Sequence, residues 1–301
     1  MKQSLIIGTR GSPLALAQVE IIRGLLVRAH PNLGVDAKII KTSGDRFVSM
    51  SLTAGGGKGL FTKEIEEQLL SDEIHLAVHS MKDLPTLLPD GLTIGAVPAR
   101  EDPHDVFVSR RVATLDELPP GARVATSSIR RKAQLLARRP DLQIEEIRGN
   151  VGTRLKKLTE KNSTLDGIIL AAAGLKRLGL WEQSKALHWQ RLEIDVMIPA
   201  VAQGIIACEV REDDRDTQEL LAPVNHANTL ACAEAERVFL RALGGGCQVP
   251  YAAHAAIAGA QMKLIGAKFS PDGKDVSKAE AIGPATDPLE LGERVAKQVL
   301  G

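Results

Sequence analysis

The first hundred residues alternate short apolar runs with amphipathic segments. Residues 4–9 form an apolar run typical of a strand, and residues 13–30 repeat apolar side chains at the spacing of a helix face. Ser12 is a good helix cap, and Pro13 suits the first helical position. The same pattern predicts a strand at 35–42, a helix at 64–70 and a strand at 74–80. Such alternation indicates a mostly parallel sheet covered by helices.

A second run with the same rhythm follows the polar, proline-containing segment 100–105. It predicts strands at 105–109, 122–127, 144–148 and 166–172, helices at 128–140 and 151–161, and a further apolar strand within 198–210.

The pattern changes after residue 226. A helix is predicted over Thr229–Leu243, followed by the glycine run 244–246. Two alternating strands, 249–259 and 262–269, then precede a turn at 270–274 and a last helix at 289–300. These elements favour a separate antiparallel α+β module, and a chain of 301 residues is long enough for two or three domains.

Composition narrows the classes of protein. The net charge is +1 and aromatic residues make up 3% of the chain, so nothing favours binding to nucleic acid or to a membrane surface. No apolar run approaches the length of a membrane span, and nothing at the N-terminus resembles a signal peptide. The three cysteines are widely spaced and no CxxC or HExxH pattern is present, so no disulfide framework or metal site is predicted. We expect a cytoplasmic protein.

Hydroxyl-bearing residues and arginines follow the predicted strands. Ligands bind at the carboxyl ends of strands in open α/β sheets, and arginine beside a helix start suits carboxylate or phosphate. The repetition predicts a ligand with several negative charges, while for any one arginine a solvated surface position remains the alternative. The segments concerned are Thr9–Ser12, His79–Asp83, Thr126–Ser128 with Arg130 and Arg131, Arg148–Asn150 with Arg154, and Lys176 with Arg177.

Asp83 is an acidic residue among these otherwise basic and hydroxyl-bearing segments. An ionised carboxylate there could accept an N–H of the ligand and stabilise a developing cation. The alternative is a helix cap or a structural salt bridge.

Cys247 lies in the glycine-rich stretch GGGCQVP, past the end of a predicted helix. Its surroundings predict an accessible thiol that could be a nucleophile or a covalent attachment point, with an inert loop cysteine as the alternative. Cys208 and Cys232 lie in apolar segments and are expected to be buried. The segment 55–61 does not match a P-loop, because Gly59 rather than Ser or Thr follows Lys58; it is either a lid or a plain surface loop.

Seven motifs in order carry a resemblance to the porphobilinogen deaminase (hydroxymethylbilane synthase) family: TRGSPLALAQ, GGKGLF, HSMKDLP, TSSIRR, RGNVGTRL, AGLKRLG and GGGCQVP. The resemblance implies two lobes like those of periplasmic binding proteins, with mainly parallel sheets, and a smaller C-terminal α+β domain. The expected bounds are 1–100 with 199–222 for the first lobe, 101–198 for the second, and 223–301 for the third domain. Members join four porphobilinogen molecules head to tail into hydroxymethylbilane and release ammonia, and a monomer is expected.

The resemblance also implies roles for residues of this chain. Cys247 would hold a dipyrromethane cofactor through a thioether, Asp83 would stabilise the cationic azafulvene left when ammonia departs, and Lys58 and Phe61 would belong to a loop over the cleft. The residues that would bind the cofactor are Ser80, Lys82, Thr126, Ser127, Ser128, Arg130, Arg131, Arg148 and Gly149. Those that would bind the substrate are Arg10, Arg148, Arg154, Arg177 and Gln203, the last matching a glutamine near the crossover between the lobes.

Two positions depart from the family pattern. Ala125 and Ala202 stand where glycine is frequent, which raises a question about local backbone geometry. The competing class is a non-catalytic, two-lobed polyanion-binding protein, which would explain the arginines but not Asp83 or Cys247.

Overall fold

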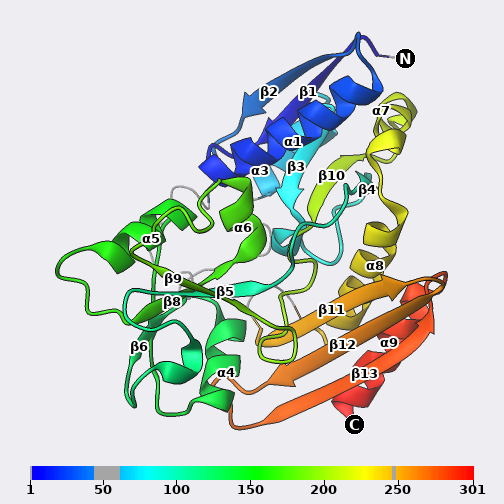
Figure 1. Ribbon diagram of the computed structural model, residues 1–301. Helices are drawn as coiled ribbons and strands as arrows, with labels where there is room; N and C mark the ends of the chain where they lie inside the picture. The colour runs from blue at the N-terminus through cyan, green and yellow to red at the C-terminus, as the bar shows by residue number, and fades with distance from the viewer. Residues whose placement is uncertain (1, 44–61, 246–248) are drawn as a thin grey trace. The chain divides into compact units, whose positions relative to one another are not determined.

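The computed structural model describes residues 2–43, 62–245 and 249–301, and the chain forms two compact units (Figure 1). Unit 1 comprises Met1–Arg100 and Ile205–Leu230, and unit 2 comprises Glu101–Gly204 and Ala231–Gly301. The chain therefore passes between the units three times.

Unit 1 contains a five-stranded sheet with the order β2-β1-β3-β10-β4. Parallel pairing joins β1 to β2 and β3, whereas β10 runs antiparallel to both β3 and β4. Four of the five strands therefore point in one direction, and the prediction of a mainly parallel sheet is confirmed. The strands are β1 (Ser4–Thr9), β2 (Gly34–Ile39), β3 (Leu76–Ser80), β4 (Leu92–Ala96) and β10 (Ile206–Arg211).

Helices cover both faces of this sheet, because alternate residues of a strand point to opposite sides. Helix α1 (Pro13–Ala29) begins at Ser12, whose Oγ accepts a hydrogen bond from the Ala15 amide at 3.2 Å, as the sequence predicted. Its buried side chains pack with Leu5 and Ile7 of β1, whereas α3 (Lys63–Leu70) packs on the other face. Helix α7 (Arg215–Leu221) completes the first of these layers.

Unit 2 repeats this arrangement with the strand order β7-β6-β8-β5-β9. Here β5 is the strand that runs antiparallel to its neighbours β8 and β9, while β6 pairs in parallel with β7 and β8. The elements are β5 (Asp105–Ser109), β6 (Arg123–Ala125), α4 (Ile129–Arg138), β7 (Gln143–Glu145), α5 (Val151–Thr159), β8 (Gly167–Ala171), α6 (Ala172–Arg177) and β9 (His188–Leu192).

The C-terminal part of unit 2 is an antiparallel sheet with α9 on one face (Figure 1), which confirms the predicted α+β module. Gly273 has φ +75, and a Cβ there would lie 2.5 Å from the Ala133 carbonyl oxygen of α4, so the turn packs directly on that helix. The elements are α8 (Ala227–Ala242), β11 (Tyr251–Ala258), β12 (Gln261–Phe269), β13 (Val276–Pro284) and α9 (Pro288–Leu300).

Several elements were not predicted: β4, β9, β13, α6 and α7. The apolar stretch 198–210 is a strand only from Ile206 onward. Its first half contains Pro199 and the left-handed residues Ala202 (φ +58) and Gly204 (φ +88), which form a turn. Within the described ranges, none of the helices has the length and apolar character needed to cross a membrane.

Candidate active site

Unit 1 brings two predicted segments to one sheet edge. Because β1 and β3 are parallel neighbours, Arg10 after β1 and Ser80 at the end of β3 lie at adjacent strand ends. A short 3₁₀ helix, η2 (Met81–Asp83), follows directly and carries Lys82 and Asp83. Asp83 is exposed, and Arg10 and Lys82 are half-buried.

The turn that bears Asp83 is anchored on both sides. The buried Gln18 donates from Nε2 to Ser80 Oγ at 2.8 Å, and the Met81 amide donates to the Ile205 carbonyl at 3.0 Å. The Met81 side chain is buried, which fixes the turn against the core. Asp83 is therefore an exposed carboxylate on a well-anchored turn.

Neither structural alternative for Asp83 holds. Ser80, not Asp83, occupies the N-cap position of η2. Among the residues that the structure describes, no carboxylate–cation pair within 4.0 Å includes Asp83. The carboxylate is thus available to a ligand.

In unit 2 the hydroxyl residues after β6 stabilise the strand ends. Ser127 Oγ donates to the Ile147 carbonyl and accepts from the Ile147 amide at 3.2 Å, which ties the ends of β6 and β7 together. Ser128 caps α4 by accepting from the Arg131 amide, and Thr126 Oγ1 accepts from the Ser128 amide at 3.2 Å.

Arg130 and Arg131 are buried and bind a carboxylate of the protein itself. Nη2 of Arg131 lies 2.7 Å from Oδ1 of Asp105, and Nη2 of Arg130 lies 2.8 Å from its Oδ2. Burial disfavours the ionised carboxylate, but the two arginines outweigh burial and hold the pKa of Asp105 well below its usual value. Burial lowers the pKa of Arg130, and Asp105 opposes this.

Arg154 and Arg177 have no such partner. Arg154 Nε donates to the Gly149 carbonyl at 2.8 Å, and Arg177 Nη2 donates to the Gly204 carbonyl at 2.7 Å. Within the described part of the chain, neither guanidinium has a carboxylate at ion-pair distance. Burial lowers the pKa of both arginines, that of Arg177 to about 10. The charge of Glu101 partly offsets this effect on the pKa of Arg177. Partly buried cations without a carboxylate at ion-pair distance suit an anionic ligand.

Arg148 is a third case, because its ion pair with Glu146, at 3.0 Å, lies at the surface. Gly149 beside it has φ +110, and a Cβ there would lie 2.8 Å from the Thr153 side chain. Only glycine fits this turn without strain, and the turn sets the start of α5, which Asn150 caps.

Gln203 is fully buried in unit 2. Its Nε2 donates to the Pro103 carbonyl at 2.8 Å and to Asp105 Oδ1 at 3.0 Å. Ala202 before it adopts φ +58, and its amide donates to the buried carboxylate of Glu236 at 2.6 Å. The alanine therefore takes the left-handed conformation that glycine would adopt more easily.

Asp105 was not among the predicted site residues, because those residues follow strands whereas Asp105 opens one. Asp105 is the first residue of β5, and β5 is antiparallel, so Asp105 pairs with Ala171 at the carboxyl end of β8. A charged residue that opens an apolar strand was the signal available in the sequence.

Some predicted residues fall outside the described ranges: Lys58, Phe61 and Cys247. The prediction for the other two cysteines is confirmed, since Cys208 and Cys232 are both buried. Burial raises the pKa of the Cys208 thiol to about 12, so this thiol stays protonated and unreactive.

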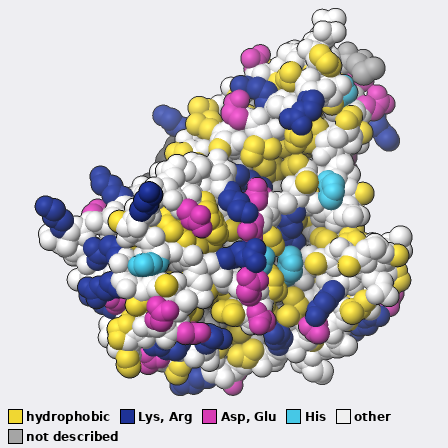
Figure 2. Space-filling view, in the orientation of Figure 1, with side chains coloured by type: hydrophobic (Ala, Val, Ile, Leu, Met, Phe, Trp, Pro, Cys, Tyr) yellow, Lys and Arg dark blue, Asp and Glu magenta, His cyan; other side chains and the backbone are white. Residues whose placement is uncertain are grey.

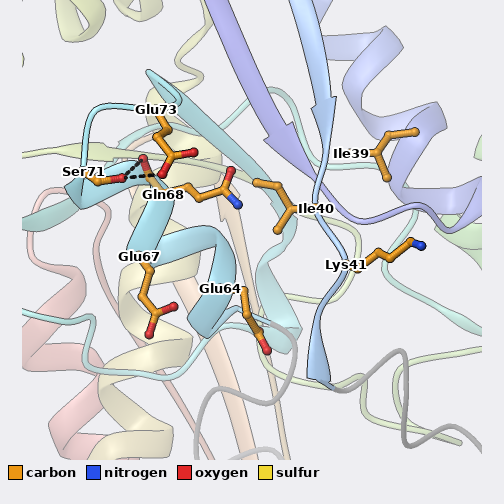
Figure 3. A pocket seen from close by; sticks show the side chains of 8 residues that line it. All are labelled: Ile39, Ile40, Lys41, Glu64, Glu67, Gln68, Ser71 and Glu73. Carbon is orange, nitrogen blue, oxygen red and sulfur yellow. Dashed lines mark hydrogen bonds between the residues drawn. The ribbon is translucent and has the colours of Figure 1, made fainter.

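A pocket of about 570 Å³ in unit 1 has the wrong charge for a polycarboxylate. It lies between α3 and the chain at the end of β2 (Figure 3), and Glu64, Glu67 and Glu73 line it together with Lys41. On the face shown in Figure 2, basic and acidic side chains are interspersed, as a net charge of +1 leads one to expect.

These features define an α/β protein that presents cationic and hydroxyl groups at the carboxyl ends of its strands, with one exposed carboxylate on an anchored turn. Two family models match the chain: "Porphobilinogen deaminase, dipyromethane cofactor binding domain" over residues 5–219 and "Porphobilinogen deaminase, C-terminal domain" over residues 230–301. The chain belongs to the porphobilinogen deaminase family, the tetrapyrrole-biosynthesis transferases that its motifs resembled.

Curated relatives are similar in sequence to this chain over nearly its whole length. Porphobilinogen deaminase of Acidithiobacillus ferrooxidans is 52% identical over 296 residues, which cover 98% of this chain and 94% of the relative. The protein of that name from Syntrophomonas wolfei is 48% identical, with 99% and 95% covered.

Solved structures show a lower similarity. A probable amino-acid ABC transporter extracellular-binding protein from Bacillus subtilis has a TM-score of 0.44 and 12% identity. The match covers 72% of this chain and 88% of that chain. The methionine-binding protein MetQ gives a TM-score of 0.43 at 13% identity, with 74% and 89% covered. These scores are low, and the α/β class rests on the sheet topology described above.

Proposed function

We propose that this protein deaminates porphobilinogen and joins four molecules of it head to tail into hydroxymethylbilane, with release of ammonia. The proposal rests on the family match over residues 5–219 and on the names of the relatives. The observation that carries it is the pair Arg154 and Arg177, two partly buried cations without a described carboxylate partner. Each pyrrole ring of the substrate and product bears two carboxylates, which would supply the missing counter-charges.

The proposed cofactor is a dipyrromethane attached through a thioether to Cys247. When bound, it supplies the covalent end on which the pyrrole chain is extended. The residues of unit 2 fit such a group, because the guanidinium groups of Arg154 and Arg177 have N–H donors left over after their backbone bonds. These donors would hold and orient its carboxylates.

Asp83 is the proposed catalytic residue. Its carboxylate would accept pyrrole N–H groups and stabilise the positive charge that develops as ammonia leaves. Anchoring by Gln18 and Met81 supports this role, since electrostatic stabilisation requires a group that is already in place.

A non-catalytic polyanion-binding protein would need the arginines but no exposed, anchored carboxylate. The three-domain division, the cytoplasmic location and the monomeric state stay predictions from the sequence.

Substitution of Asp83 tests the chemistry. We expect Asp83→Asn, which keeps the shape and loses the charge, to slow ammonia release about 10²–10³-fold. Asp83→Glu keeps the charge and should retain part of the activity. Both variants should melt near the wild-type temperature, because the Asp83 side chain is exposed and forms no ion pair with the described residues. Near wild-type turnover by Asp83→Asn would sink the catalytic assignment.

Intact mass tests the attachment point. The purified wild-type protein should be heavier than its sequence by a group of two pyrrole rings, and Cys247→Ser should lack this addition. Cys232→Ala is the control and should keep the added mass. An active wild-type protein with the mass of the unmodified sequence would contradict the proposed cofactor.

A further inference from the structure

Asp105 occupies an unusual position for a charged residue. It opens β5 and is fully buried, with an exposed fraction of 0%. Because β5 runs antiparallel to β8, Asp105 lies beside Ala171 at the end of β8. Its carboxylate is therefore at the edge of the sheet where the ligand-binding arginines follow their strands.

Three side chains from two distant segments converge on this carboxylate. Arg131 donates from Nε at 3.1 Å and from Nη2 at 2.7 Å to Oδ1. Arg130 Nη2 lies 2.8 Å from Oδ2, and Gln203 Nε2 donates to Oδ1 at 3.0 Å. Carbonyl oxygens accept one further N–H from each arginine, that of Ile198 from Arg130 and that of Ile169 from Arg131.

The charges of this cluster do not balance. Two arginines and one aspartate leave one positive charge in a buried environment. Arg154 adds to it: burial lowers the pKa of Arg154 most, and the charge of Arg131 lowers it further. A buried ion pair is weak evidence for a purely stabilising role, because desolvation offsets most of its attraction. An excess cation held in fixed orientation is instead suited to meeting an incoming carboxylate.

We propose that Asp105 is a positioning residue: with Gln203 bound to the same carboxylate, it sets the orientation of Arg130 and Arg131 so that their remaining N–H donors meet the carboxylates of the pyrrole chain. This inference rests on the proposed function. The inference goes beyond the proposed function because it assigns a role to Asp105, a residue that itself touches no ligand.

The test compares Asp105→Asn and Asp105→Glu with Asp166→Asn. Asp166 is a matched control, since it is a buried aspartate of the same sheet that pairs with Arg111 at 2.7 Å and accepts from the Arg123 amide at 2.8 Å. It precedes β8, at the opposite end of the sheet from the site. For each purified protein we would measure melting temperature, KM and kcat for porphobilinogen, and the added mass on Cys247.

We expect Asp105→Asn to raise KM about tenfold or more and to reduce the loaded fraction, while kcat of the loaded protein changes less. Asp105→Glu keeps the charge and hence the fold, but moves the carboxylate and should also raise KM. If Asp105→Asn does not fold, the KM and the loaded fraction of Asp105→Glu decide between the outcomes. Asp166→Asn should lower the melting temperature and leave KM and loading unchanged.

A wild-type KM and full loading in folded Asp105→Glu would overturn the inference, as would an equal rise in KM in Asp166→Asn. The proposed function fails separately, if the wild-type protein does not consume porphobilinogen.

Discussion

Two groups of arginines at the same edge of the unit 2 sheet differ in where their counter-charge comes from. Arg130 and Arg131 share the buried carboxylate of Asp105. Arg154 and Arg177 donate to backbone carbonyls and have no carboxylate partner among the described residues. The first pair is held in place by the protein, and in the proposed function an anionic ligand would supply the counter-charge of the second pair.

This difference separates stability from binding. Removing a partner of a buried ion pair leaves an uncompensated charge, which destabilises the fold. Removing a partly buried cation that has only a backbone carbonyl as partner relieves a desolvation penalty, which offsets the lost hydrogen bond, and the main cost is expected when the ligand binds. Variants of Arg130 and Arg131 should therefore lose stability, whereas variants of Arg154 and Arg177 should keep their stability and lose affinity for the ligand.

The largest expected effect on folding is that of Arg131→Leu. Asp105 would keep Arg130 but lose two charged N–H donors, and the Ile169 carbonyl would lose its donor. We therefore expect the free energy of unfolding to fall by about 3–5 kcal/mol in urea titrations. Arg138→Leu is a control on the same helix, because the ion pair of Arg138 with Asp116 is exposed, and it should change the value by less than about 1 kcal/mol. Equal losses in the two variants would contradict the distinction.

Arg177→Leu should show the reverse pattern. The ligand-free protein should be as stable as wild type or more stable, while the affinity for porphobilinogen falls roughly 10- to 100-fold, the loss expected for a hydrogen bond to a charged group. KM and denaturation measured on the same preparation would check both parts. A strongly destabilised variant with normal KM would show that Arg177 belongs with the paired group.

The pH dependence of stability gives a further test of the unpaired group. Burial lowers the pKa of Arg177 to about 10, below that of an arginine in the unfolded chain, so between these two values the unfolded chain binds more protons than the folded one. The contribution of Arg177 to the free energy of unfolding therefore rises with pH in this window. Arg177→Leu should exceed wild type in melting temperature below about pH 10, and the gap should narrow above it. A gap that stays constant to about pH 11 would argue against a depressed pKa.

The smallest effect is expected at the surface pair of Arg148 and Glu146. Glu146→Gln should change the free energy of unfolding by less than about 1 kcal/mol, because exposed ion pairs contribute little. A loss comparable to that of Arg131→Leu in the same urea titration would mean that this pair is structural.

The sequence predicted those elements whose cause is local. Ser12 and Pro13 marked the start of α1, and the apolar alternation marked β11 and β12. The basic residues after β6, β7 and β8 marked the edge of the sheet proposed to bind the ligand. The strands β9 and β13 were missed because their exposed polar positions hide the pattern.

What the sequence determined by itself was the α/β class, the set of motifs that identify the family, and the choice of arginines and Asp83 as candidates. Which arginines are paired was decided by the tertiary structure alone. Arg131 meets Asp105 across 26 residues of chain, and Gln203 meets it across 98. Helix caps and periodicities act over a few residues, whereas the partner of a buried charge depends on strand direction, here the antiparallel insertion of β5 that places the start of one strand beside the end of another.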